Sequence, residues 1–112
     1  MDIKNSRRLT LRALKKVLPK ASVFTGLIHR HAYARDAGFY RLLPQIVIKA
    51  STAKDITHIF REANARNRRV VFRAGGTSLS GQSISDDILV EIKQDWRNME
   101  VLEQGQYIVM EP

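Results

Sequence analysis

The sequence predicts an α+β fold in which a strand, a helix and a second strand form a βαβ unit, with further strands after it. Gln45–Lys49 and Val70–Phe72 are compact β-branched runs of the kind that form buried strands. Between them, apolar residues recur at helical spacing over about 14 residues. Strands joined by such a helix are expected to be parallel, with a right-handed crossover. A glycine-rich loop, residues 73–82, follows the second strand.

Length and composition restrict the class of protein. At 112 residues the chain has room for one small domain, and its 44% apolar content is that of a globular protein. It has no cysteine, which excludes disulfides, thiolate catalysis and cysteine-bound zinc or iron–sulfur sites within these residues. No apolar run approaches the ~18 residues of a membrane span, and the N-terminus lacks the apolar core of a signal peptide. A cytoplasmic location is therefore expected, with peripheral attachment to the inner face of the membrane as an alternative.

Charge is unevenly distributed along the chain. Residues 1–73 contain 17 lysines and arginines against 4 acidic residues, whereas residues 74–112 contain 2 against 7. A basic half of this kind is typical of proteins that meet nucleic acid, an anionic membrane or an acidic partner. A solvated basic face is the plain alternative.

Residues 1–43 are expected to form an N-terminal helix and an irregular lead-in. Residues 1–20 predict the helix, with Asn5 or Ser6 as its N-cap and Pro19 ending it. Its narrow apolar stripe favours packing against protein over lying on anionic lipid. The stripe consists of Leu11, Leu14, Val17 and Leu18.

Residues 21–43 show weak periodicity and are expected to be irregular or to form short helical turns. His29 and His31 alternate, which favours a strand or loop over a helix. Because no third ligand stands at a suitable spacing, a metal site is not expected there.

Residues 44–112 are expected to form a partial domain that is truncated at its C-terminal end. Ser51 or Thr52 can cap the central helix, with Asp55 as the acid of a capping box. The helix is expected to end near residues 64–67, where asparagines tolerate the left-handed conformation.

Two further strands are predicted after the loop, at Ile88–Ile92 and Tyr107–Met110. Gln104 and Gly105 form a turn before the second of these strands, at which the chain nearly ends. The apolar side chains between the strands are expected to pack on the sheet. These are Trp96, Met99 and Val101.

The glycine-rich loop has the composition of an anion-binding turn. Its ten residues include three glycines and three hydroxyl residues. Glycine permits positive φ and close approach of the backbone, and successive N–H groups in such a turn form a concave anion site. The loop lacks the dinucleotide, P-loop and hydrolase-elbow patterns. From the residues alone, phosphate binding and a plain connection are equally favoured.

Chemistry carried by single side chains is not indicated. Ser78 and Ser80 have no evident histidine or acid partner, which argues against nucleophilic catalysis. Asp86 and Asp87 are adjacent, so their side chains point apart and suit paired acid–base work poorly.

The loop, Arg-Ala-Gly-Gly-Thr-Ser-Leu-Ser-Gly-Gln, resembles the Arg-Gly-Gly-Gly-Thr-Ser-Leu-x-Gly-Gln loop of FAD-linked oxidases of the vanillyl-alcohol-oxidase (PCMH) type. The strand at Gln45–Lys49, the helix start at residues 51–56 and the strand at Ile88–Ile92 resemble the flanks of that loop. Tyr33–Arg41 resembles an upstream segment of the D-lactate dehydrogenase, glycolate oxidase and D-2-hydroxyglutarate dehydrogenase branch. The resemblance runs from about residue 30 to the end and implies the first subdomain of a PCMH-type FAD-binding domain.

The resemblance implies that the loop binds the FAD pyrophosphate. Thr77 stands where relatives with covalent FAD carry histidine, so the resemblance implies non-covalent FAD. Ala74 replaces a loop glycine, which indicates ordinary φ there. Arg73 is expected to brace the loop or add positive charge, with a surface salt bridge as the alternative. Asp36 is expected to hold the upstream segment, with catalysis as the alternative. The expected cofactor-binding residues are Arg73, Ala74, Gly75, Gly76, Thr77, Ser78, Ser80, Gly81 and Gln82.

The implied parent is a flavin-dependent D-2-hydroxy-acid dehydrogenase, D-lactate-like, that passes electrons from FAD to a quinone or protein acceptor. The expected partners are FAD and the remainder of the parent polypeptide. No catalytic residue is expected in this chain, which should be inactive alone. Two alternatives remain: a small basic nucleic-acid-binding module, and an assembly fragment that self-associates through an exposed apolar edge.

Overall fold

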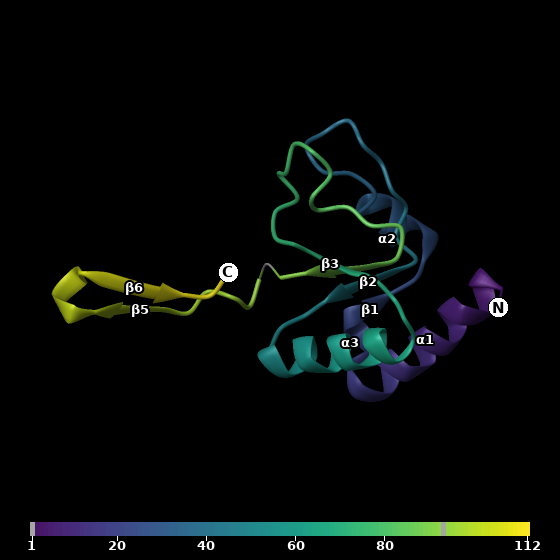
Figure 1. The fold of residues 1–112 in the computed structure, drawn as a ribbon, viewed down its shortest axis with the longest axis horizontal. Coiled ribbons are helices and arrows are strands. Elements are labelled where there is room, and N and C mark those ends of the chain that lie inside the picture. The colour runs from purple at the N-terminus through teal and green to yellow at the C-terminus, as the bar shows by residue number, and fades with distance from the viewer. Residues whose placement is uncertain (1, 93) are drawn as a thin grey trace.

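The computed structural model describes residues 2–92 and 94–112 (Figure 1). The helices are α1 (Ile3–Val17), α2 (Leu27–Ala32) and α3 (Ala53–Ala65), with short 3₁₀ turns η1 (Lys20–Ser22) and η2 (Glu103–Gly105). The strands are β1 (Val23–Phe24), β2 (Ile46–Lys49), β3 (Val70–Arg73), β4 (Ile88–Glu91), β5 (Met99–Leu102) and β6 (Tyr107–Met110). The predicted α+β class is confirmed.

A four-stranded mixed sheet forms the centre of the fold, in the order β1-β2-β4-β3. The strands β2, β4 and β3 are parallel, and β1 pairs antiparallel to β2. As predicted, α3 connects two parallel strands. These two strands are not neighbours, because β4 lies between them and pairs Ile88 with both Ile46 and Val70.

The core lies between the sheet and the two longer helices. Helices α1 and α3 cover one face of the sheet, and the chain between β3 and β4 extends from the opposite side (Figure 1). Fully buried side chains of β2 and β4 pack on Leu14 of α1 and Ile59 of α3. The strand β4 is buried along Ile88–Val90, as expected for a parallel strand covered on both faces.

The N-cap predicted from the sequence is the one observed for α3 but not for α1. Thr52 caps α3 and forms a reciprocal capping box with Asp55, and Asn67 has the expected positive φ, at 50°. The prediction of Asn5 or Ser6 as the N-cap of α1 is wrong. The cap is Asp2, whose carboxylate accepts a hydrogen bond from the Lys4 N–H, so the helix begins a turn earlier.

The lead-in contains the short helix α2, in line with the expected short helical turns, and the two-residue strand β1. His29 and His31 lie on α2, which corrects the expectation of a strand or loop. The His29 ring stacks on Phe24 with centroids 4.6 Å apart, and His31 Nδ1 lies 2.9 Å from Arg41 Nη2. These tertiary contacts, which the alternating pattern does not reveal, favour the short helix.

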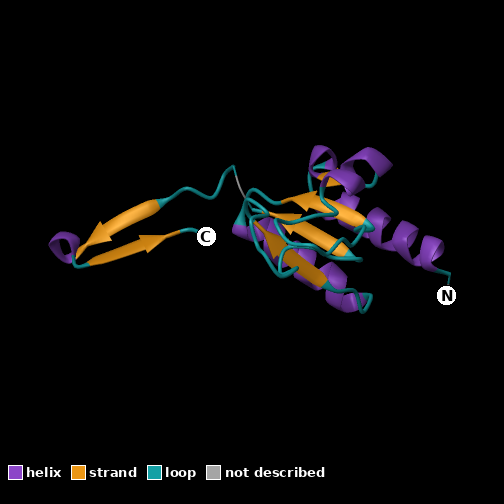
Figure 2. Ribbon diagram, turned by 90° about the horizontal axis from the view of Figure 1, so that it is seen from above, coloured by secondary structure: helices purple, strands orange, loops and turns teal. Residues whose placement is uncertain are grey.

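The last two strands form a separate hairpin that projects from the sheet (Figure 2). Trp96 approaches the sheet, and its Nε1 donates a hydrogen bond to the Ala50 carbonyl at 2.7 Å. The expectation that Met99 and Val101 pack on the sheet is wrong, since their exposed fractions are 64% and 55%. They stay exposed because β5 pairs with β6 instead of extending the larger sheet.

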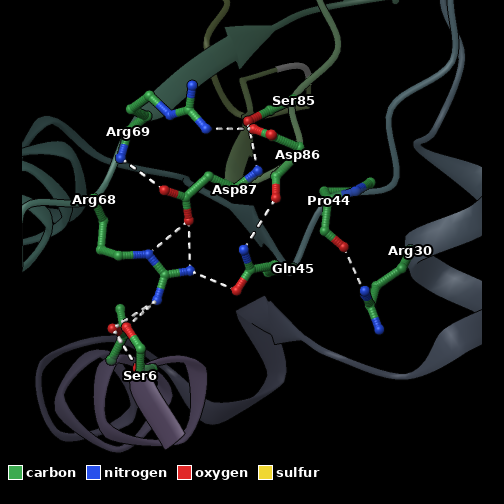
Figure 3. A network of polar contacts seen from close by, with 10 residues as sticks. Ser6, Arg30, Pro44, Gln45, Arg68, Arg69, Ser85, Asp86 and Asp87 are labelled. Carbon is green, nitrogen blue, oxygen red and sulfur yellow. Dashed lines mark hydrogen bonds and ion pairs between the residues drawn. The ribbon is translucent and has the colours of Figure 1, made fainter. Parts of the chain in front are cut away.

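A buried ion pair between Arg68 and Asp87 joins the starts of β3 and β4, and hydrogen bonds from Arg68 extend it to α1 and the start of β2 (Figure 3). The Asp87 carboxylate accepts from Arg68 Nε at 2.7 Å and from the Arg69 N–H at 2.9 Å. The Arg68 guanidinium also donates to Gln45 Oε1 and Thr10 Oγ1, at 3.0 and 3.1 Å. The end of the β3–β4 connection is therefore fixed to the helix and sheet together.

Candidate functional site

The glycine-rich loop begins at the carboxyl end of β3, where parallel strands commonly present ligand sites. It leaves at Arg73 and the chain returns at Asp87, beside the start of β4. Both ends of this excursion are thus attached to the central sheet, while the loop between them extends beyond it (Figure 1).

A row of unused backbone donors lies in this loop. No hydrogen bond within the described residues has an N–H group of residues 75–79 as its donor. The next two N–H groups are used: that of Ser80 donates to Gln82 Oε1 at 3.1 Å, and that of Gly81 donates to Asp36 Oδ2 at 2.9 Å. Gly76 and Gly81 have φ of 69° and 80°. A run of free N–H groups that contains one positive-φ glycine and is followed closely by another is typical of an anion-binding concavity.

The Arg73 side chain links the start of the loop to the segment at residues 33–35. Its guanidinium Nη1 donates to the Arg35 carbonyl at 2.9 Å and contacts the Tyr33 carbonyl at 3.5 Å, and its Cζ lies 5.2 Å from the Tyr33 ring centroid. Among the described residues no ion pair includes Arg73, so the alternative of a surface salt bridge is wrong. The guanidinium occupies the space that a Cβ on Gly76 would need. Its Nε is buried and has no hydrogen-bond partner.

Tyr33 is a residue of the site that sequence reasoning did not single out. Burial raises the pKa of its phenol well above the ordinary value, and the neighbouring Glu91 carboxylate raises it further. The phenol therefore stays neutral, and its ring serves as a platform for Arg73. The signal in the sequence was its place at the head of the upstream segment.

Asp36 connects the upstream segment to the loop. Its two carboxylate oxygens accept from the N–H groups of Gly38 and Gly81, at 2.8 and 2.9 Å. The Ala37 N–H also donates to the Ser78 carbonyl at 2.9 Å. The expected structural role of Asp36 is confirmed, although its contacts reach the loop as well as its own segment.

The predicted site residues divide into two groups by position. Ala74, Gly75 and Thr77 are exposed, and Gly76 and Ser78 are half-buried beside them. Ala74 is absent from the described residues with positive φ, which confirms ordinary φ at that position. The second group, which holds the loop in shape, consists of Arg73, Ser80, Gly81 and Gln82.

The described part of the chain contains neither a metal-ligating cluster nor a membrane-spanning helix. No group of three or more metal-ligating side chains occurs there. No helix within residues 2–92 and 94–112 has the length and apolar character needed to cross a bilayer.

A model of the family described as FAD binding domain matches residues 44–112, more than half of the chain. The chain belongs to this FAD-binding family. The match includes the loop, its flanking strands and the hairpin, but not the lead-in that contains Tyr33 and Asp36.

A similar sequence and similar solved structures support the assignment to this family. D-2-hydroxyglutarate dehydrogenase of Haemophilus influenzae is 31% identical over 78 residues, which are 67% of this chain and 8% of that protein. A solved alkyldihydroxyacetonephosphate synthase has a TM-score of 0.70 at 11% identity, covering 87% of this chain and 22% of the other. Physcomitrella patens BBE-like 1 has a TM-score of 0.65 at 14% identity, covering 82% and 20%. These two structures share the fold, and the chain spans a small part of each relative.

Proposed function

We propose that this chain provides the wall of an FAD site that holds the pyrophosphate. The row of free N–H groups at residues 75–79 is the observation that carries the proposal, since a diphosphate needs several donors converging on one anion. Close approach of the phosphates is possible where the loop has no side chain, at Gly75 and Gly76. The residues present therefore fit the group that the family binds.

The loop residues have distinct roles in this proposal. Residues 75–79 donate backbone N–H groups, and the exposed Thr77 and half-buried Ser78 add hydroxyl donors. Arg73 adds positive charge below the loop while its contacts to the upstream segment hold the backbone. Ser80, Gly81 and Gln82 shape the loop, and Ala74 connects it to β3.

The parent protein is proposed to be an oxidoreductase that acts on a D-2-hydroxy acid, with D-lactate as the nearest substrate type. Support comes from the relative named D-2-hydroxyglutarate dehydrogenase and from the upstream segment. When bound, FAD would accept a hydride from the substrate, and a quinone or protein would then take the electrons. This chain contributes binding and orientation, and no catalytic residue is proposed within it.

The β5–β6 hairpin supports a role as part of a larger assembly. The pairs Met99 with Met110 and Val101 with Ile108 share one face, and Leu102 with Tyr107 lies on the other. All of these side chains are exposed, although a two-stranded hairpin is marginally stable alone. A ribbon that is apolar on both faces fits between two layers, which the remainder of the parent polypeptide is proposed to provide. In its absence, self-association through the hairpin is expected.

Titration of FAD with the purified chain, followed by flavin fluorescence, tests whether the loop binds the pyrophosphate. FAD should bind saturably, and inorganic pyrophosphate should compete, because both offer the same anion to residues 75–79. Riboflavin has the same ring system without phosphates and serves as the matched control ligand. Equal binding of riboflavin and FAD would show that the loop does not recognise the phosphates.

Non-covalent attachment is tested on the full-length parent. Thr77 carries a hydroxyl, which cannot form the histidyl link implied for relatives with covalent FAD. Precipitation of the holoprotein with acid should leave the yellow flavin in the supernatant. Flavin absorbance that remains with the washed pellet would contradict the proposal.

A further inference from the structure

The segment at residues 33–41 lies outside the part of the chain that the family model matches, yet it contacts the loop at several points. It provides the Arg35 carbonyl for Arg73, the Ala37 N–H for the Ser78 carbonyl and the Asp36 carboxylate for Gly81. The segment and the loop therefore behave as one packed unit.

Asp36 is the most specific of these contacts. Each of its carboxylate oxygens accepts one backbone N–H, one from Gly38 in its own segment and one from Gly81 in the loop, 45 residues along the chain. No ion pair within the described residues includes Asp36, so its charge is met by amide groups. Hydrogen bonds to an ionised acceptor are roughly twice as strong as neutral ones.

The packing around Gly38 supports the same conclusion. A Cβ on Gly38 would collide with the Leu79 carbonyl and touch Asp36 Oδ1. The backbones at Gly38 and Leu79 are thus in direct contact, and the Asp36 carboxylate bridges the two segments at Gly81. This close fit fixes the direction of the loop at Ser78–Gly81.

We infer that Asp36 is a positioning residue that holds the loop with its donor row exposed before any anion binds. The Asp36 carboxylate accepts from the Gly81 N–H and the Gln82 amide oxygen accepts from the Ser80 N–H, so the run of free N–H groups that includes residues 75–79 ends before Ser80. The Gln82 amide and the Asp36 carboxylate together limit the donor row on its C-terminal side. This inference rests on the proposed function only for the identity of the ligand.

Substitution of Asp36 by asparagine tests the inference. The amide keeps the size of the side chain but has one acceptor oxygen, so one of the two bonds is lost whichever way it is oriented. In the absence of FAD, deuterium exchange at Gly38 or Gly81 should become about tenfold faster. Asp36→Ala should accelerate exchange at both. The affinity for FAD should fall by about tenfold in the same variants.

Asp95→Asn is the matched control, since it removes the same charge from an exposed side chain outside the loop. It should change neither exchange nor affinity. Exchange in β4 separates positioning from general stabilisation: unchanged protection of Ile88–Val90 supports the inference, whereas faster exchange throughout the sheet would overturn it. Wild-type exchange at both Gly38 and Gly81 in Asp36→Ala would also overturn it. Because exchange is measured without ligand, failure of FAD to bind would refute the proposed function and leave this test intact.

Discussion

Replacing Asp87 with alanine is expected to lower the free energy of unfolding by about 3–5 kcal/mol, because it leaves the Arg68 guanidinium buried without its carboxylate. The two side chains are only 9% and 7% exposed. The substitution also removes the acceptor of the Arg69 N–H. Since small domains are stable by only about 5–15 kcal/mol, the loss is a large fraction of the total. Urea denaturation followed by circular dichroism measures it.

The neighbouring residue provides the matched control. Asp86 also pairs with an arginine, but the Asp86 and Arg69 side chains are 56% and 76% exposed, so Asp86→Ala should cost less than about 1 kcal/mol. Equal losses of unfolding free energy in Asp87→Ala and Asp86→Ala would contradict a stabilising role for the buried Arg68–Asp87 pair. Replacing Arg68 and Asp87 together by methionine and leucine should recover much of the stability, because neither charge is then left buried alone.

Replacing Gly76 with valine is expected to weaken FAD binding at least about tenfold. At φ of 69° a β-branched residue is strained, and its Cβ would overlap the Arg73 guanidinium. The loop must then move its N–H groups or displace Arg73 from the Tyr33 ring. The fluorescence titration described above measures the change.

Gly105→Val is the control for backbone strain alone. Gly105 also has positive φ, at 94°, but it lies in the turn of the β5–β6 hairpin and a Cβ there would meet no atom within 4 Å. This variant should bind FAD like the wild type. Wild-type affinity in Gly76→Val would mean that the pyrophosphate is held elsewhere.

Local signals in the sequence predicted the elements that depend on local physics. The capping box of Thr52 and Asp55 fixes the start of α3, and the left-handed Asn67 follows its end. The β-branched runs became β2 and β3 almost residue for residue. The glycines of the loop were informative because positive φ and close packing at Gly76 leave few alternatives.

Features that depend on pairing between distant segments could not be predicted in the same way. The position of β4 between β2 and β3 is a choice among strand partners that no local pattern encodes. The pairing of Arg68 with Asp87 joins residues 19 positions apart, and neither has an unusual neighbour in the sequence. Met99 and Val101 are apolar like core residues, but they stay exposed because β5 pairs with β6 instead of joining the larger sheet.

The order of the strands has a consequence for how the chain acquires its shape. β4 is the last of the four strands in sequence, yet both β2 and β3 pair with it. Until β4 is in place, β3 has no partner in the sheet and the loop has no fixed exit. Closing the loop and completing the core are therefore expected to be one cooperative event. Folding itself would then arrange the free N–H groups of residues 75–79. The entropic cost of ordering the loop would belong to folding and would not weaken ligand binding.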